Sequence, residues 1–202
     1  MPVWKKPATG AVLALCLALG TAASAAPDGK VSFGDHNFSL QFPSTWVREP
    51  EPSAPQILRA QAPGGQANLI VIADKSAGAA STEEFAASNL QALRHVFGEK
   101  LKLESDEPVA LKNGEGHVLV LAQELLAADS TPLKIKQYMM LFVAHGTGYA
   151  VTCTAREDFY KSLEKTFQSI GQSVLITAGD TAAADRRANA ALESKTSSEP
   201  EK

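Results

Sequence analysis

Cys153 is the first residue whose type could support covalent chemistry. It lies in the stretch YAVTCTA, where one face of an expected strand would carry Tyr149, Val151, Cys153 and Ala155. A nucleophilic thiol needs a base or a positive environment that holds it as the thiolate, and apolar neighbours in the middle of a strand oppose that. The sequence therefore predicts a buried structural cysteine.

The histidines are the candidates for metal binding or acid–base catalysis. His36 and His145 fall in expected turns, His95 falls on an expected helix, and His117 stands next to a turn. A zinc site needs three or four converging ligands, and none of these histidines has another metal-type ligand at a useful spacing. We expect solvated surface histidines and no metal or other cofactor.

The common catalytic motifs do not accompany these residues. The sequence contains no G-x-S-x-G nucleophile elbow, no phosphate-binding P-loop and no calcium loop. The acidic pairs Glu49/Glu51 and Asp106/Glu107 are expected in loops, where such charges are usually only solvated. The carboxylates of a glycosidase are defined by their separation in the fold, so they stay open as an alternative. We expect a protein that is not an enzyme.

Three aromatic residues are candidates for a binding surface: Trp46, Tyr138 and Tyr149. The phenylalanines mostly fall on apolar faces of expected strands and helices, whereas these three are less well explained as core. Tyrosine and tryptophan often lie where one end of the side chain is apolar and the other is solvated, as in a groove or a partner surface. For Trp46 we expect a core plug first and a docking residue second.

The elements that must position these residues follow a clear order along the chain. Alternating apolar residues predict strands at 31–33, 38–42, 56–62, 67–74, 101–104, 107–111, 116–126, 133–144 and 147–155. Helical spacing and capping residues predict one helix from Ser81 to Gly98 and another from about Asp158 to Gly171. Residues 44–47 are expected to form a short helical turn.

These elements define an α+β class with a central antiparallel β-sheet covered by helices. Consecutive hairpins make the sheet antiparallel, and helices with one apolar face must cover it. The run Leu69-Ile70-Val71-Ile72 is apolar on both faces. Such a strand is expected in the middle of a sheet that is covered on both sides.

The first 25 residues are typical of a bacterial secretory signal peptide. Lys5 and Lys6 form a basic region, residues 10–20 form an apolar region, and residues 23–25 form a small-residue cleavage site. We expect cleavage after Ala25 and a periplasmic protein. An uncleaved membrane anchor is the alternative, although the apolar run has only about half of the roughly 20 residues that a membrane span needs.

Lipid attachment at Cys16 is not expected, because lipoprotein processing needs a small residue directly before the cysteine and Leu15 is large. Cleavage would leave Cys153 without an intramolecular disulfide partner. It would also remove two lysines and shift the formal net charge from −3 to about −5. With no basic patch in the sequence, we expect no nucleic-acid binding.

The C-terminal segment 177–202 is separable from the expected folded domain of residues 26–176. Its only large apolar side chain is Leu192, so burial could not offset the entropy lost on ordering it. We expect a disordered polar tail. A partner-binding helix at residues 182–192 is the alternative, because this stretch is rich in alanine.

Two motifs carry a resemblance to a known family. The stretch FSLQFPSTWV at residues 38–47 and the final GYAVTCTAREDFYKSLEKTFQSIGQSVLI, in which a strand runs into an amphipathic helix, together resemble the PsbP-like superfamily. Within it, the chain looks similar to bacterial exported proteins of the DcrB type. The resemblance covers residues 31–176. It implies a central antiparallel sheet between helices, used mainly for binding, with no shared catalytic residues.

The leading functional hypothesis is therefore a non-enzymatic periplasmic protein that binds another protein at the cell envelope, through a sheet face or a groove near Trp46. A second hypothesis is a small-molecule or lipid carrier that uses an apolar cleft between sheet and helix. An enzyme is the third.

Overall fold

The computed structural model describes residues 29–78, 80–127 and 130–177. The expected signal peptide with its cleavage site and Cys16, and the expected tail beyond Thr177, lie outside these residues. Within the described part of the chain, none of the helices is long and apolar enough to cross a bilayer.

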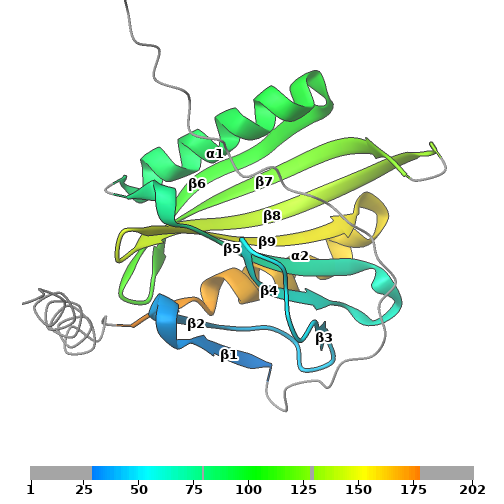
Figure 1. Cartoon of the computed structure of the whole chain (residues 1–202). Coiled ribbons are helices and arrows are strands. Elements are labelled where there is room, and N and C mark those ends of the chain that lie inside the picture. The colour runs from blue at the N-terminus through cyan, green and yellow to red at the C-terminus, as the bar shows by residue number, and fades with distance from the viewer. Residues whose placement is uncertain (1–28, 79, 128–129, 178–202) are drawn as a thin grey trace, which may run out of the picture.

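A seven-stranded antiparallel sheet dominates the structure (Figure 1). In spatial order its strands are β3 (Val47–Arg48), β4 (Gln56–Gln61), β5 (Ala67–Asp74), β9 (Thr147–Arg156), β8 (Pro132–Ala144), β7 (Gly114–Leu126) and β6 (Leu101–Leu111). A second sheet of three strands has the order β1 (Lys30–Phe33), β2 (Phe38–Gln41) and β10 (Leu175–Ile176).

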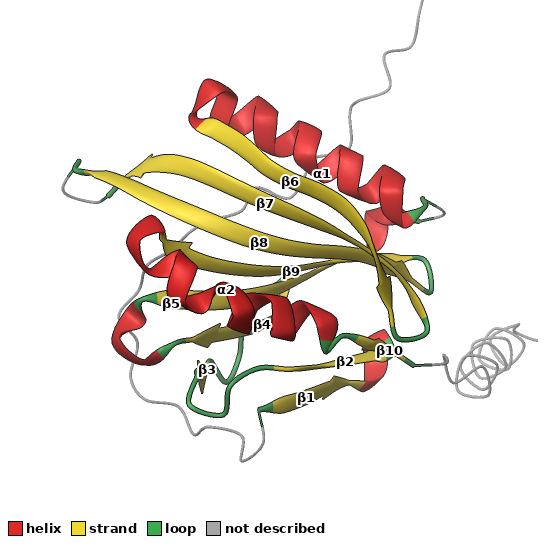
Figure 2. Cartoon of the chain, turned by 180° about the vertical axis from the view of Figure 1, so that it is seen from behind, coloured by secondary structure: helices red, strands yellow, loops and turns green. Residues whose placement is uncertain are grey.

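The two long helices cover opposite faces of the large sheet. Helix α1 (Thr82–Phe97) lies over β6, β7 and β8 on one face. Helix α2 (Glu157–Gln172) lies on the other face, next to the small sheet (Figure 2). The observed architecture is α+β with a central antiparallel sheet covered by helices, which confirms the expected fold class.

Strand β5 shows how the two cores are separated. Leu69 and Val71 pack in the core under α2, and Ile70 and Ile72 pack in the core under α1. All four side chains are buried. The apolar run in this strand therefore predicted correctly a central strand covered on both sides.

The ends of α1 follow from its local sequence. The Ser81 hydroxyl accepts a hydrogen bond from the Glu84 N–H at 3.1 Å, and the Glu84 carboxylate accepts one from the Ser81 N–H at 2.8 Å. This capping box satisfies N–H groups that the first helical turn leaves unpaired. Gly98 ends the helix with φ of 55°, a conformation that glycine adopts without steric cost. The expected boundaries of this helix are confirmed.

The small sheet joins the beginning of the described chain to its end. Strand β10 pairs with β2, and the Gln41 N–H donates to the Ser173 hydroxyl at 2.8 Å across 132 positions of sequence. The β1–β2 hairpin was expected from the sequence. The two-residue strands β3 and β10 were not, because each is too short to show alternation.

Two local predictions are wrong. Residues 44–47 form no helical turn, because the Trp46 N–H donates to the Pro43 carbonyl at 2.9 Å and closes a reverse turn over residues 43–46, and the chain enters β3 at Val47. Residues 101–111 form one strand and not two. A register shift between Leu103 and Ser105 takes up the extra residue, as a β-bulge does, so the strand continues past it.

Candidate binding site

A cavity of about 180 Å³ lies at one end of the large sheet. Its walls come from the β4–β5 connection, the start of β8 and the end of β9, which meet at the same end of the sheet (Figure 1). The residues that matter most below are Gln61, Asn68, Leu133, Ile135, Thr154 and Arg156. We call this cavity the end cavity.

Polar side chains form a row across four neighbouring strands at the end cavity. Gln61 of β4 is paired with Asn68 of β5, Asn68 with Thr154 of β9, and Thr154 with Gln137 of β8. Directly opposed residues of antiparallel strands point to the same face, with Cβ atoms about 4.5–5.5 Å apart. These side chains therefore lie side by side on the face that α1 partly covers.

Behind the end cavity, buried amides hold this row in place. The Gln123 Nε2 donates to the Gln137 Oε1 at 3.0 Å, and the Gln137 Nε2 donates to the Thr154 hydroxyl at 3.1 Å. Gln137 is fully buried and Gln123 and Thr154 nearly so. A hydrogen-bonded network in such surroundings fixes the rotamers of its members, because breaking any bond leaves a buried polar group unpaired.

The charges at the end cavity are paired at the surface. The Arg156 guanidinium donates through Nε and Nη2 to the Asp158 carboxylate, at 3.2 and 2.8 Å. Nearby on β4, Arg59 lies 3.2 Å from the carboxylate of Glu49. The lining side chains include no carboxylate.

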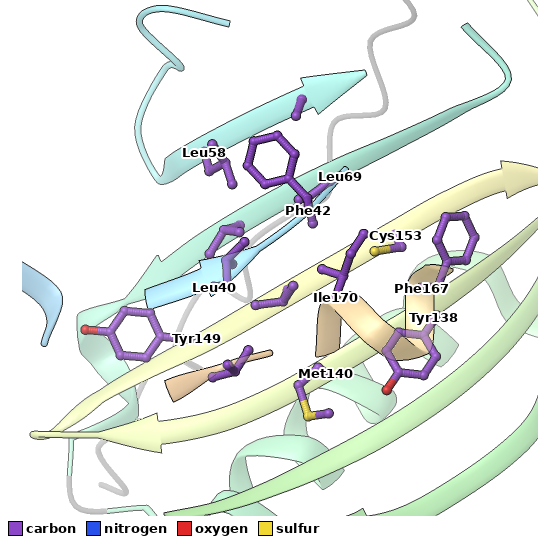
Figure 3. Close-up of a cluster of buried hydrophobic side chains, with 14 of the residues drawn as sticks. Leu40, Phe42, Leu58, Leu69, Tyr138, Met140, Tyr149, Cys153, Phe167 and Ile170 are labelled. Atoms are coloured by element: carbon purple, nitrogen blue, oxygen red, sulfur yellow. The ribbon is translucent and has the colours of Figure 1, made fainter. Parts of the chain in front are cut away.

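Tyr138 and Tyr149, expected on a binding surface, lie in the core instead, and Trp46 lies in the core as first expected. Trp46, Tyr138 and Tyr149 are 3%, 6% and 2% exposed. Trp46 packs edge-to-face on Phe167 of α2, with ring centroids 6.4 Å apart. Figure 3 shows Tyr138 and Tyr149 among the core side chains over the sheet. They line no surface in this structure, because the hairpin β1–β2 and α2 bring apolar side chains onto the same sheet face.

Burial also changes the acidity of these tyrosines. Burial, together with the nearby Cys153, raises the pKa of Tyr138 to about 12, from an ordinary value of about 10. Burial likewise raises the pKa of Tyr149 and of Tyr160. These phenols therefore stay protonated in the folded chain at neutral pH.

This shift predicts a loss of stability at alkaline pH. Between about pH 10 and about pH 12 the unfolded chain releases the Tyr138 proton while the folded chain keeps it, so the free energy of unfolding falls as the pH rises through that window. Urea denaturation at a series of pH values measures the slope. Tyr138→Phe should reduce the slope and leave the part that Tyr149 and Tyr160 contribute. A slope equal to that of the unmodified chain would contradict the assignment.

Cys153 is fully buried and is a free thiol, as the sequence predicted. Figure 3 places it between the sheet and α2. Burial raises the pKa of the Cys153 thiol far above its usual range, which removes the reactive thiolate.

The burial of Cys153 predicts slow chemical labelling. In a Cys16→Ser variant of the chain, a bulky thiol reagent should label the native protein on the timescale of unfolding and label the urea-unfolded protein at once. Release of the coloured leaving group measures both rates. Equal rates in the two states would show that the thiol is accessible.

The histidines are only partly the surface residues expected. His95 is exposed, and His145 is exposed with its Nε2 3.1 Å from the Thr177 carbonyl. His36 is half-buried, with its Nδ1 3.3 Å from the Tyr149 hydroxyl. The side chain of His117 is only 12% exposed, so solvation does not describe it.

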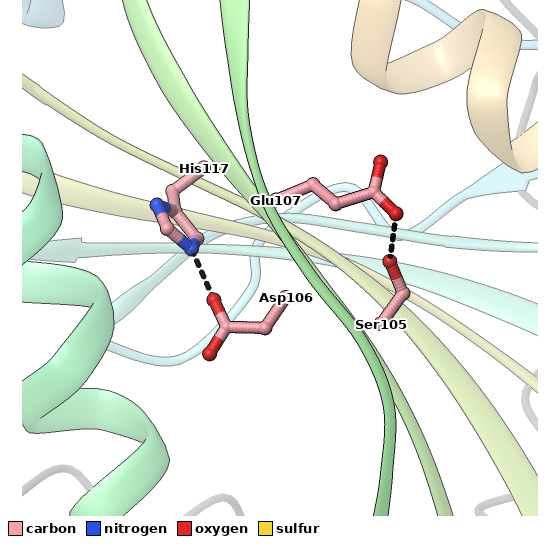
Figure 4. Close-up of polar contacts among 4 residues, drawn as sticks. All are labelled: Ser105, Asp106, Glu107 and His117. Carbon is pink, nitrogen blue, oxygen red and sulfur yellow. Dashed lines mark hydrogen bonds and ion pairs between the residues drawn. The ribbon is translucent and has the colours of Figure 1, made fainter.

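The prediction that the acidic pair Asp106/Glu107 lies in a loop is also wrong. Because β6 is continuous, both acids lie in a strand and not in a loop. The Asp106 carboxylate is hydrogen-bonded to the His117 Nε2 of β7, and Glu107 accepts a hydrogen bond from the Ser105 hydroxyl at 2.8 Å (Figure 4). In the described part of the chain, no three residues among His, Cys, Asp and Glu come close enough together to hold a metal ion.

No protein-family model matches the chain, and no curated protein matches it. Solved structures do. Cyanobacterial PsbP (CyanoP) from Synechocystis sp. PCC 6803 is 12% identical, with a TM-score of 0.54 over 78% of this chain and 98% of that chain. The Ran-binding protein Mog1p of Saccharomyces cerevisiae is 8% identical, with a TM-score of 0.54 over 74% of this chain and 95% of that chain.

These similarities identify the fold. The chain has the PsbP-like fold, as the two sequence motifs indicated. At 12% and 8% identity, the likeness concerns the fold and not the activity of either protein. The narrower resemblance to the DcrB type stays a prediction.

Proposed function

We propose that this protein is a non-enzymatic protein of the bacterial envelope that binds a protein partner through the end cavity. The observation that carries the proposal is the cavity itself, about 180 Å³ in volume and walled by ordered strands. Apolar cavities of about 150 Å³ accept a benzene ring. The end cavity is therefore large enough for one aromatic or aliphatic side chain.

A cavity of this size suits the centre of a protein interface. Binding energy in interfaces is concentrated in a few anchor side chains that fill desolvated pockets. Around the end cavity, the β4–β5 connection is exposed at Gly65 and Gln66 and offers backbone and amide groups for a polar rim.

Two further facts support this proposal. Mog1p, which shares the fold, is a Ran-binding protein, so the fold is compatible with protein recognition. The N-terminal pattern typical of a signal peptide makes a periplasmic location the expected one, and an envelope protein the expected partner.

The competing function is a carrier of a small molecule or lipid. The space between the sheet and α2, where a carrier cleft was expected, holds tightly packed side chains. Phe167 and Ile170 of α2 and Cys153 of β9 are buried there to 1% exposure or less. A carrier of this architecture would use the end cavity as well, so the two functions differ in what enters it.

Site-specific photocrosslinking in the native host tests the proposal. A photoreactive amino acid at Gln66, which is exposed on the rim of the end cavity, should give one discrete adduct of protein mass. The matched control is the same amino acid at Lys161, exposed on α2. An adduct from both positions, or from neither, would contradict the proposal.

A further inference from the structure

The hairpin that joins β7 to β8 projects beyond the rest of the large sheet (Figure 1). Strand β6 pairs with β7 only as far as Gln123, and β9 pairs with β8 only from Ile135 onwards. Within the described part of the chain, residues 124–126 and 132–134 therefore pair only with each other. We call the described residues from 124 to 134 the arm.

One face of the arm carries an exposed apolar side chain. Leu126 is 65% exposed and is, with Val96, one of two large apolar side chains exposed in the described part of the chain. Pro132 lies directly opposite Leu126 and is exposed as well. Leu133, which lines the end cavity, follows Pro132 and so points to the other face of the arm. Leu126 therefore points away from the end cavity of its own chain.

The end cavity matches such a side chain in size and in lining. Its volume of about 180 Å³ is larger than the roughly 150 Å³ that accept a benzene ring, so the isobutyl group of a leucine can enter it. Ala67, Leu133, Ile135 and Ala155 give it apolar walls. Transfer of an exposed leucine into this cavity is favourable because apolar surface leaves water.

The charges beside Leu126 complement those at the end cavity. Glu124 shares the face of Leu126, and Lys134 lies directly opposite Glu124. Neither makes an ion pair within the described residues. At the end cavity, the Arg156 and Asp158 side chains are 58% and 55% exposed. With Leu126 of one copy in the end cavity of another, Glu124 can face Arg156 and Lys134 can face Asp158.

We propose that the protein forms a symmetric dimer in which the arm of each copy lies over the end cavity of the other and Leu126 fills it. Each copy carries both the arm and the cavity, as a twofold interface requires, because the same surface must serve on both subunits. The proposal rests on the proposed function, since it names a second copy of the chain as the protein partner.

The size of this contact sets its expected strength. Ten described residues line the end cavity, and the arm adds eight more. Stable interfaces use about 20–30 residues on each side, so this one lies just below that range. We therefore expect a reversible dimer with a dissociation constant in the micromolar range.

Sedimentation equilibrium of the full chain, over a concentration series from micromolar to millimolar, tests the dimer. Leu126→Asp should raise the dissociation constant about tenfold for each of the two sites, about a hundredfold in all, as loss of an interface anchor does. Leu126 is exposed, so circular dichroism in urea should show unchanged stability.

Val96→Asp is the matched control, because Val96 is 55% exposed and lies on α1, outside the arm. It should leave the dissociation constant unchanged. A chain that stays monomeric throughout the series, or a dimer that both variants weaken equally, overturns the proposal.

The photocrosslinking experiment separates the dimer from the proposed function. With the photoreactive amino acid at Gln66, the dimer predicts an adduct of twice the mass of the chain, attached through the arm and lost in Leu126→Asp. An adduct with a different protein overturns the dimer and leaves the proposed function standing. No adduct from position 66, or an equal adduct from Lys161, overturns both.

Discussion

Replacement of Trp46 by alanine is expected to lower the free energy of unfolding by about 3–5 kcal/mol, the range for truncating a buried large aromatic side chain. Trp46 is 3% exposed and packs against Phe167 of α2, so its removal leaves a void between the turn after β2 and that helix. Urea denaturation followed by circular dichroism measures the loss. Val96→Ala is the control, because Val96 is 55% exposed, and its effect should stay within about 0.5 kcal/mol.

A milder substitution separates the two roles considered for this tryptophan. Trp46→Phe should lower stability while the folded fraction still forms the photoadduct from position 66. An adduct lost at unchanged stability would make Trp46 a docking residue and contradict its place in the core.

Gly171→Ala is expected to destabilise the chain by about 1–3 kcal/mol, as overpacking does. A Cβ at this position would lie 2.7 Å from the Tyr138 hydroxyl oxygen and 3.1 Å from the Met140 Cε. Both partners are buried, so α2 or the sheet must shift. The effect opposes the gain of about 1 kcal/mol that alanine brings to a helix.

Gly34→Ala is the matched control for this experiment, because a Cβ there meets nothing within 4 Å. Both variants are compared by urea denaturation with the unmodified chain. If Gly171→Ala were as stable as Gly34→Ala, α2 would not approach the sheet as closely as the structure shows.

Most of the fold could be predicted from local patterns in the sequence. Alternation located β4, β5, β7, β8 and β9 to within a residue or two, and the pair Ser81 and Glu84 located the start of α1, because these signals arise from neighbours in sequence. The break expected within 101–111 was wrong because Pro108 and the charges of β6 are tolerated on a sheet edge.

The candidate site could not be predicted from local sequence patterns. Asn68 and Thr154 are neighbours only because β5 and β9 pair across more than half of the described chain. One signal was present: Gln137 occupies an inward position of a strand otherwise rich in apolar residues, and a buried amide needs partners. Tyr138 and Tyr149 were misplaced because tyrosine is also a good core residue once its ring is covered, whereas Trp46 was expected first in the core.

The pairing of β2 with β10 determines when, during synthesis, the small sheet can be completed. Because a chain is made from its N-terminus, β2 is made before the elements that pack on it and pair with it. Ser173, which accepts the hydrogen bond of the Gln41 N–H, follows only 132 positions later. Until β8 and β9 are made, Phe38 of the first hairpin lacks the aromatic rings on which it packs, Phe142 of β8 and Tyr149 of β9. The nascent chain therefore exposes an apolar first hairpin until β8 and β9 follow, and the last turn of α2 with β10 then completes the hydrogen bonding of β2.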